Sequence, residues 1–297
     1  MKIAYFGLPL GALALAGDGL SLGPVVLAPV DAPGRRRAQK LWPAALDALA
    51  AGPDFDKQVS AALASEQPAL LASWFWTRRL PAEWLGLPPL GAIGIHPSLL
   101  PRHRGPNPYF WAIDSGDELT GVTAHRLEPD YDTGVMLGAR TIEVAERDAW
   151  QLARALDRPS LALLRATVAR LARGESLPET AQDENLATWA PEPSGDALRV
   201  DFGWTTERVL RRIRALSPTP GLALEVEGVE LFVTRAVAVA TYVAALLPGE
   251  AHIAPDALFL RTGDGAVQVT GAFFPDTEES VASAGSVAAA LRRRAQP

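Results

Sequence analysis

The sequence predicts an α/β fold with a mostly parallel sheet, followed by a smaller β domain. Three observations lead to this prediction. In the N-terminal part, short apolar runs with the character of buried strands alternate with helical segments, which is the pattern of βαβ units. A polar, proline-rich stretch without periodicity, 174–195, then indicates a connection between domains. Beyond it, short β-like runs separated by glycine turns are typical of a small barrel or sandwich.

Six segments of the N-terminal part predict strands. They are 2–7, 25–30, 69–76, 92–95, 121–127 and 135–137. The first four are uniformly apolar and bounded by turn residues, which is typical of strands that are covered on both faces. The fifth alternates between apolar and polar residues, as a strand with two different faces does. The sheet of this part is therefore expected to be mostly parallel.

Helical periodicity marks the other regular segments. Apolar residues recur at helical spacing along 148–173, and 56–66 predicts a shorter helix. In the C-terminal part, Thr205 or Thr206 can cap a helix that ends at Leu216. Short β-like runs and a last helix follow it at 222–226, 230–239, 257–261, 266–272 and 281–294. The predicted domains are 1–174 and 199–297, joined by a linker over 175–198.

Composition excludes several classes of function. The chain has 297 residues, a formal net charge of −6 and no cysteine. An acidic protein binds nucleic acid poorly without a specific site, because phosphate contacts supply most of that affinity, so DNA is not an expected partner. The lack of cysteine excludes disulfides, thiolate metal ligands and a cysteine nucleophile, and we expect no metal. No apolar run approaches the roughly 18 residues of a membrane span. We expect a cytoplasmic monomer.

His96 stands where a predicted strand meets a proline-rich loop, within GAIGIHPSLLPRHRGPNP at 91–108. A histidine in such a place is more often a core or capping residue. This one lies at the carboxyl end of a sheet strand, which is where open α/β sheets place their ligands. An imidazole tied to a stiff loop can be held in one pose for acid–base chemistry. His96 is therefore a candidate catalytic residue.

The segment EPDYDTG at 128–134 places three carboxylates in one turn. On its own, an acidic turn is usually a solvated loop. Asp132 gains interest because His96 needs a partner: a carboxylate beside an imidazole orients the ring and raises its pKa. The sequence does not show that the two side chains meet. Their convergence on one cleft is the hypothesis on which the functional interpretation depends.

Two further clusters each allow a structural and a functional interpretation. The three aromatic residues at the end of the strand over 69–76 are either core or the wall of a pocket for a flat ring. They are Trp74, Phe75 and Trp76. The basic residues of 31–40 belong either to a solvated loop or to a phosphate-binding site. They are Arg35, Arg36, Arg37 and Lys40.

Together, IHPSLLPRHRG at 95–105 and EPDYDTG resemble the folate-dependent formyltransferase family. The start MKIAYFG, the segment LPPLGAIGIHPSLLP and the segment LTGVT extend the resemblance over the N-terminal part. In the C-terminal part, VDFGWTTERVLRRIRALSPTPG at 200–221 is similar to the C-terminal domain of the methionyl-tRNA formyltransferases of that family. SLLP followed by RG and later by DTG is a specific combination.

The resemblance implies a Rossmann-like N-terminal domain and a small C-terminal β-barrel (OB-like) domain. It implies transfer of a formyl group from 10-formyltetrahydrofolate to an amine, with initiator methionyl-tRNA as the leading acceptor and a role in protein biosynthesis. His96 and Asp132 would be the catalytic pair, and Arg35, Arg36, Arg37 and Lys40 would bind the tRNA. The folate would be bound by Ser98, Leu99, Leu100, Pro101, Trp74, Phe75, Trp76, Glu128, Asp130 and Tyr131.

One position departs from the family's pattern. The family carries an asparagine two residues before the histidine, and its amide helps to hold the oxyanion of the reaction; here that residue is Gly94. Losing one such donor typically costs about 2.7–4 kcal/mol. A water or Asn107 could substitute, and if the site is only weakened, Gly94→Asn should increase transfer. Three alternatives stay open: a methionyl-tRNA enzyme, a formyltransferase for an amino sugar or amino acid derivative, and a folate- or RNA-binding homologue without turnover.

Overall fold

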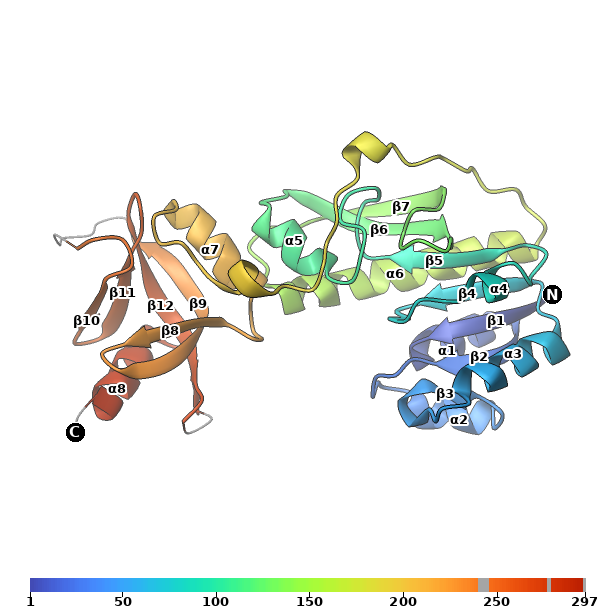
Figure 1. The fold of residues 1–297 in the computed structure, drawn as a ribbon, viewed down its shortest axis with the longest axis horizontal. Helices are drawn as coiled ribbons and strands as arrows, with labels where there is room; N and C mark the ends of the chain where they lie inside the picture. Colours follow the sequence, from blue (N-terminus) through green and yellow to red (C-terminus); the bar gives the residue numbers. More distant parts are fainter. Residues whose placement is uncertain (240–245, 277–278, 296–297) are drawn as a thin grey trace. The chain divides into compact units, whose positions relative to one another are not determined.

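A computed structural model of the chain describes residues 1–239, 246–276 and 279–295. They belong to two units, each assembled from segments that are far apart in the sequence (Figure 1). The first unit contains 1–108, 119–143 and 155–190, and the second contains 109–118, 144–154 and the chain from 191 onward. The boundaries expected from the sequence, with one continuous domain on each side of a linker, stay a prediction.

A seven-stranded sheet forms the centre of the first unit. Its strands are β1 (Lys2–Gly7), β2 (Ser21–Leu27), β3 (Leu46–Asp47), β4 (Leu70–Trp74), β5 (Ala92–His96), β6 (Leu119–Arg126) and β7 (Met136–Glu143). Their order in the sheet is β3-β2-β1-β4-β5-β6-β7. The first five are parallel to one another, whereas β6 is antiparallel to both of its neighbours, β5 and β7. The predicted Rossmann-like, mostly parallel sheet is confirmed, and it brings the carboxyl ends of β4 and β5 to the same edge.

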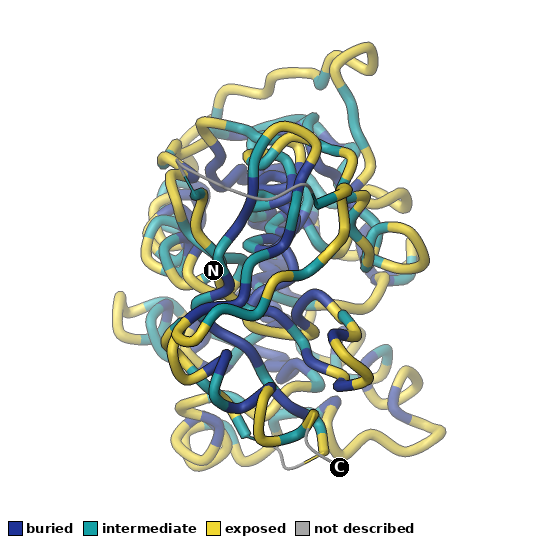
Figure 2. Tube along the Cα trace, turned by 90° about the vertical axis from the view of Figure 1, so that its left-hand side faces the viewer, coloured by how far each residue is buried: buried dark blue, intermediate teal, exposed yellow. Residues whose placement is uncertain are grey.

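Helices cover both faces of this sheet, which explains why its central strands are apolar throughout. The helices of the N-terminal part are α1 (Pro9–Gly17), α2 (Arg35–Leu41), α3 (Phe55–Glu66), α4 (Ala82–Leu85), α5 (Pro108–Asp114) and α6 (Ala149–Ala172), with short 3₁₀ helices at Ala48–Ala50 and Glu184–Leu186. On one face, Phe6 of β1 packs in a cluster with residues of α3 and α4, including Trp84. On the other face, the indole N–H of Trp74 donates to Ser160 of α6 at 3.0 Å. Figure 2 shows the buried strands running through the interior.

The second unit contains a curled antiparallel sheet, as the predicted small β domain requires. Its order is β10-β11-β12-β9-β8, and β13 pairs with β12. The elements are a 3₁₀ helix (Gly195–Leu198), α7 (Thr206–Ala215), β8 (Leu222–Val226), β9 (Val229–Val239), β10 (Ala251–Ala254), β11 (Ala257–Arg261), β12 (Ala266–Phe274), β13 (Glu279–Val281) and α8 (Ala284–Ala295). No helix in the described segments has both the length and the apolar character that crossing a membrane requires.

Asp114, at the end of α5, is a buried anion within the second unit. Its exposed fraction is 3 %, and its carboxylate accepts hydrogen bonds from Arg208 Nη2 at 2.9 Å and Arg212 Nη2 at 3.0 Å. Burial by itself raises the pKa of Asp114, but the hydrogen bonds and charges of the two guanidinium groups outweigh it and lower the pKa from its ordinary value. Both arginines are therefore committed to holding α7 on α5.

Candidate functional site

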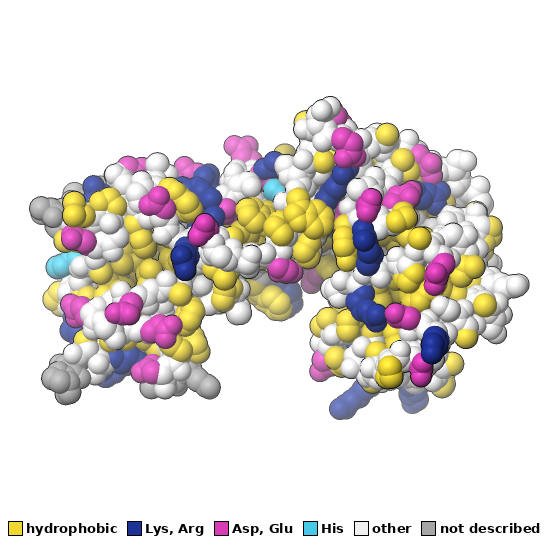
Figure 3. Space-filling view, in the orientation of Figure 1, with side chains coloured by type: hydrophobic (Ala, Val, Ile, Leu, Met, Phe, Trp, Pro, Cys, Tyr) yellow, Lys and Arg dark blue, Asp and Glu magenta, His cyan; other side chains and the backbone are white. Residues whose placement is uncertain are grey.

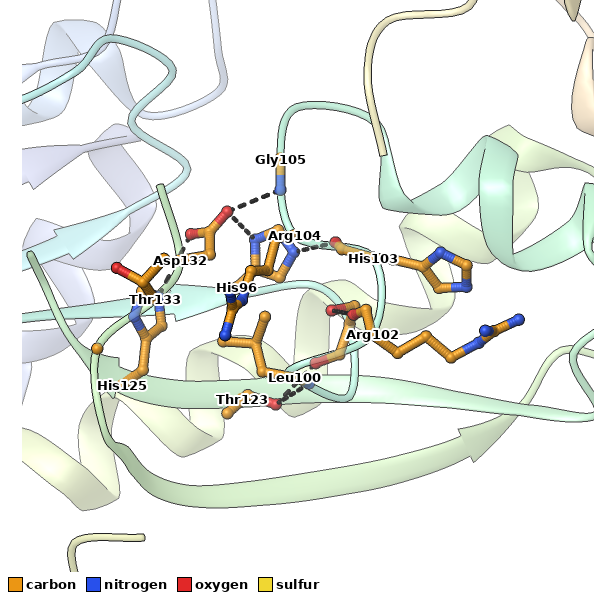
Figure 4. A network of polar contacts seen from close by, with 12 residues as sticks. His96, Leu100, Arg102, His103, Arg104, Gly105, Thr123, His125, Asp132 and Thr133 are labelled. Carbon is orange, nitrogen blue, oxygen red and sulfur yellow. Dashed lines mark hydrogen bonds and ion pairs between the residues drawn. The ribbon is translucent and has the colours of Figure 1, made fainter. Parts of the chain in front are cut away.

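His96 and Asp132 meet at the carboxyl end of β5. His96 is the last residue of β5, and Asp132 lies in the loop that joins the neighbouring strands β6 and β7. Figure 4 shows the two side chains facing each other, with His96 Nδ1 at 3.4 Å from Asp132 Oδ2. Both are largely buried: the side chains retain 7 % and 15 % of their exposed surface. The structure therefore brings together the two residues on which the functional hypothesis depends.

The surrounding loops hold both side chains in one orientation. The main-chain N–H of Gly105 donates to Asp132 Oδ2 at 2.9 Å, and His96 Nε2 lies 2.8 Å from the carbonyl oxygen of His103. A carbonyl oxygen only accepts hydrogen bonds, so His96 Nε2 carries the hydrogen in this contact. Asp132 has a φ of +58°, in the left-handed region that L residues rarely adopt, and Gln182 donates to its carbonyl oxygen at 2.7 Å. Hydrogen bonds to its main chain and to its carboxylate thus hold Asp132 in one orientation.

A cavity of about 80 Å³, partly open to solvent, adjoins this pair and has Asp132 in its wall. It is lined by Ser73, Trp76, Arg78, Arg79, Leu80, Leu85, Leu127, Glu128, Pro129, Asp130, Tyr131 and Asp132. Apolar walls combined with carboxylates suit a flat heterocycle that carries N–H donors. Four of the residues predicted to bind folate are in this lining: Trp76, Glu128, Asp130 and Tyr131.

Trp74 and Phe75 do not belong to the lining of this cavity as the described residues form it. Trp74 lies on the opposite face of the sheet, against α6. Phe75 has a φ of +53°, so the chain turns after β4 ends, and Trp76 packs edge-on against Phe6 instead of continuing the strand. Their predicted contact with the folate is therefore not supported by the position of either side chain.

The residues of the SLLP segment, Ser98–Pro101, also lie outside the cavity lining of the described chain. Their hydrogen bonds stabilise the loop that contains His103, whose carbonyl oxygen contacts His96. Ser98 Oγ donates to the carbonyl oxygen of Arg102 at 2.6 Å, and Leu100 N–H donates to Thr123 Oγ1 at 3.1 Å. Thr123 in turn donates to the carbonyl oxygen of Ser98 at 2.7 Å. A direct folate contact for Ser98, Leu99, Leu100 and Pro101 stays a prediction.

Arg35 differs from the other basic residues of its segment. It is 8 % exposed, and its guanidinium contacts the carboxylate of Asp47 and the carbonyl oxygens of Ala28 and Val30. This arrangement ties α2 to β3 and to the end of β2, and it leaves the group unable to reach a phosphate. Arg36, Arg37 and Lys40 are exposed. The predicted basic cluster is therefore reduced to these three.

His125 completes the site, although no sequence motif had pointed to it. It is 2 % exposed, and its Nε2 lies 3.5 Å from Asp132 Oδ1, the carboxylate oxygen that His96 does not contact. Burial lowers the pKa of His125 to about 4; the charge of Asp132 raises it, and the charge of His96 lowers it further. The available signal was the alternation of 121–127, which places Thr123, His125 and Leu127 on one face of the strand.

The pKa of His125 predicts a loss of stability in mild acid. An unfolded histidine titrates near 6.5, whereas this one titrates at about 4 in the folded protein. Between these values the unfolded chain binds more protons, so the free energy of unfolding should fall as the pH falls from about 6.5 to 4. Urea titrations at several pH values would measure it. In His125→Gln this part of the pH dependence should disappear; an unchanged slope would contradict the assignment.

Two protein-family models match the chain. The model for the formyl transferase domain matches residues 27–164, and the model for the formyl transferase C-terminal domain matches 195–283. The solved structure of HypX from Aquifex aeolicus in complex with tetrahydrofolic acid has a TM-score of 0.65 at 22 % identity, covering 97 % of this chain and 46 % of that one. The N-formyltransferase from Helicobacter canadensis, solved with folinic acid and dTDP-3-aminofucose, has a TM-score of 0.68 at 12 % identity, covering 91 % and 98 %. These structures share the fold.

Closer sequence similarity comes from curated relatives. The methionyl-tRNA formyltransferase of Koribacter versatilis (strain Ellin345) is 33 % identical over 211 residues, which is 70 % of this chain and 66 % of that protein, just under two thirds of its length. The methionyl-tRNA formyltransferase of Bordetella petrii is 32 % identical over 296 residues, or 91 % of each chain. With both domain models matched and identity of this level over almost the whole length, the chain belongs to the formyl transferase family.

Proposed function

We propose that the protein transfers a formyl group from 10-formyltetrahydrofolate to a primary amine. The observation that carries this proposal is the 3.4 Å contact between His96 Nδ1 and Asp132 Oδ2 beside a cavity that has Asp132 in its wall. It combines a group that can gain and lose a proton, a carboxylate that orients it, and an adjoining cavity with apolar and acidic walls. The described residues contain no set of three or more His, Cys, Asp or Glu side chains arranged to hold a metal ion.

The chemistry of the cavity lining supports folate as the ligand. Trp76, Leu80 and Leu127 offer apolar surfaces to a flat ring, and the carboxylates of Glu128 and Asp130 can accept hydrogen bonds from ring N–H groups. Tyr131 and Arg79 lie at the same site, with the guanidinium 5.1 Å from the ring centre and Arg79 Nη2 donating to Asp130 at 2.8 Å. When bound, the cofactor supplies the formyl group. The chain's own residues must then orient the amine, stabilise developing charge and move one proton.

His96 and Asp132 suit the last two tasks. In the resting protein, both nitrogens of His96 face oxygen acceptors, Asp132 Oδ2 and the His103 carbonyl. The charged ring can donate to both, and it can exchange the His103 carbonyl for an oxygen of the substrate on which negative charge develops. Asp132, held by the Gly105 N–H, stabilises the charged ring and keeps it in place. The pair therefore acts as an electrostatic partner for the formyl oxygen.

We propose methionyl-tRNA as the acceptor. Both parts of the chain resemble the curated methionyl-tRNA formyltransferases, and the alignment with the Bordetella petrii protein covers 91 % of each. Three exposed basic residues, Arg36, Arg37 and Lys40, remain available for phosphate at α2. The test is direct: incubate the pure protein with 10-formyltetrahydrofolate and charged initiator tRNA and measure formyl-methionine after hydrolysis. Absence of product, with folate bound, would reject this acceptor.

An amino sugar or another small amine is the second candidate. It is favoured because several arginines that could bind tRNA already have acidic partners within the protein. Arg35 is internal, and Arg208 and Arg212 are bound to Asp114. The other arginines of α7 also have acidic partners: Arg211 pairs with Glu207 at 2.9 Å, and Arg214 pairs with Glu146. On the face shown in Figure 3, Lys and Arg side chains lie among Asp and Glu side chains. The same assay with nucleotide-linked amino sugars would distinguish the two acceptors.

Removing the three exposed charges at α2 should weaken tRNA binding if tRNA is the acceptor. In Arg36→Ala/Arg37→Ala/Lys40→Ala, the slope of log affinity against log salt should become shallower by about two to three, because each lost phosphate contact removes close to one released ion. Filter binding across a salt series measures it. Arg35 is left unchanged because it is internal.

A matched control removes the same charge from elsewhere in the first unit. Arg165→Ala/Arg170→Ala/Arg173→Ala also deletes three exposed or half-exposed positive groups, each paired with a carboxylate. Its salt slope should stay near that of the unaltered protein. Equal slopes for both triple variants would remove the α2 residues from the tRNA site.

A further inference from the structure

Gly94 and His125 are direct neighbours across the β5–β6 pair. The register places Gly94 opposite His125 and Ile95 opposite Ala124. A Cβ atom at position 94 would lie 3.4 Å from His125 Nε2 and 2.7 Å from Leu127 Cδ2. The glycine therefore leaves space that the imidazole and Leu127 fill. His125 is thus the polar side chain next to position 94, where the family has the amide of an asparagine and this chain has glycine.

Asp132 lies between two imidazoles that are held in the same way. His125 Nδ1 lies 2.8 Å from the carbonyl oxygen of Arg126, as His96 Nε2 lies 2.8 Å from that of His103. A carbonyl only accepts, so each of these nitrogens carries a hydrogen. The remaining nitrogen of each ring faces a different oxygen of one carboxylate, at 3.4 Å for His96 and 3.5 Å for His125. The two rings are nearly perpendicular, with centres 6.4 Å apart.

A proton can be shared between His125 Nε2 and Asp132 Oδ1, which are 3.5 Å apart. In the neutral ring, Nε2 presents a lone pair to a carboxylate oxygen, and two acceptors attract each other only when a proton lies between them. Burial opposes a positive charge on His125 most strongly; the charge of Asp132 favours it, and the charges of His96 and Arg104 oppose it. A charge on His96 thus disfavours a charge on His125. When His96 gives up its proton, its part of the opposition ends and the attraction of Asp132 remains.

We propose that His125 is a positioning residue that acts through Asp132 and takes up, for part of each cycle, the proton that the reaction moves. The proposal rests on the proposed function. The cluster accepts one proton as the amine nitrogen bonds to the formyl carbon. It returns one proton to the leaving nitrogen, which keeps the electron pair of the bond that breaks. No proton is gained or lost overall, so the cluster ends each cycle as it began.

Two substitutions at position 125 test this role. His125→Gln keeps a polar side chain that can donate to Asp132 but cannot take up a proton, and His125→Leu removes the polar group. Both should lower kcat by about tenfold or more, the scale of coupling within one polar network, with KM for folate and amine within about twofold. The solvent deuterium isotope effect on kcat should increase in His125→Gln. A histidine replaced elsewhere, His252→Gln on exposed β10, should change none of these values.

Gly94→Asn provides an independent test of the same arrangement. Its Cβ would lie 2.7 Å from Leu127 Cδ2, so Leu127 must shift, and the amide beyond it would compete with the imidazole for space; we expect lower transfer, contrary to the gain expected from the sequence alone. Gly94→Asn/His125→Ala should be at least as active as His125→Ala by itself, because alanine removes the imidazole that competes with the amide. Full kcat in a folded His125→Gln, or a gain in Gly94→Asn with His125 present, would overturn the role of His125. Failure of the unaltered protein to transfer formyl to any amine would overturn the proposed function as well.

Discussion

Replacing His96 by alanine should reduce formyl transfer by about 10²- to 10⁴-fold, the usual contribution of a positioned acid–base group. The ring contacts Asp132 at 3.4 Å and the His103 carbonyl at 2.8 Å, and alanine can make neither contact. His96 is absent from the lining of the cavity formed by the described residues, so the folate should still bind. Single-turnover transfer measures the rate, and quenching of the tryptophan fluorescence, to which Trp76 contributes, measures folate binding.

Asp132→Asn separates the charge of the partner from its shape. An asparagine can still accept from the Gly105 N–H, which now donates at 2.9 Å, but it carries no charge to stabilise the imidazolium. The rate should fall by a similar factor, and folate affinity should change little, because asparagine keeps the size of the side chain in the cavity wall. If His96→Ala retained half or more of the turnover, the catalytic role of the pair would be refuted.

The central sheet and the place of His96 at its edge were predictable because local patterns determine both. Apolar runs of strand length define β1, β4 and β5 in the sequence, and the burial of all but the first residue of β1 follows from coverage on both faces. His96 ends β5, so its place at the sheet edge follows from the strand itself. The approach of Asp132 was a hypothesis drawn from chemistry. The β6–β7 loop makes the contact, and no local pattern reports where such a loop turns.

The aromatic cluster shows where local patterns fail. Trp74 and Trp76 are two residues apart and would share a face if the strand continued. The strand ends at Trp74, and the left-handed backbone of Phe75 sends Trp76 to the other face. A positive φ at a phenylalanine has no sequence signature, because glycine and asparagine are the residues that usually mark it.

Arg35 and His125 depend on partners that only the folded chain provides. Arg35 lies in a run of three arginines, and its burial follows from Asp47, twelve residues later, and from two carbonyl oxygens. His125 has the alternation of a strand residue, and its meaning comes from Gly94 on the next strand and Asp132 in the following loop. The glycine that departs from the family's pattern in the sequence leaves, in the structure, the space that Leu127 occupies next to His125.

Asp114→Ala should have the largest effect on stability in the second unit. Its carboxylate binds two guanidinium groups, of which that of Arg212 is 5 % exposed. Arg212 also donates to main-chain carbonyls at 196, 197 and 199, and its guanidinium lies 5.2 Å from the ring centre of Trp204. Without the carboxylate, Arg212 remains in place as a buried positive charge that lacks a counterion. Breaking a buried pair in this way typically costs about 3–5 kcal/mol.

Urea denaturation followed by circular dichroism measures this loss, and three variants separate its causes. Asp114→Asn keeps the hydrogen-bond acceptor and loses the charge, so its loss should lie between that of alanine and zero. Glu207→Gln removes the exposed partner of Arg211 and should change the free energy of unfolding by less than about 1 kcal/mol. Asp114→Ala/Arg212→Met, which removes the stranded charge, should recover part of the stability. A loss below about 1 kcal/mol in Asp114→Ala would show that the second unit does not depend on this buried pair.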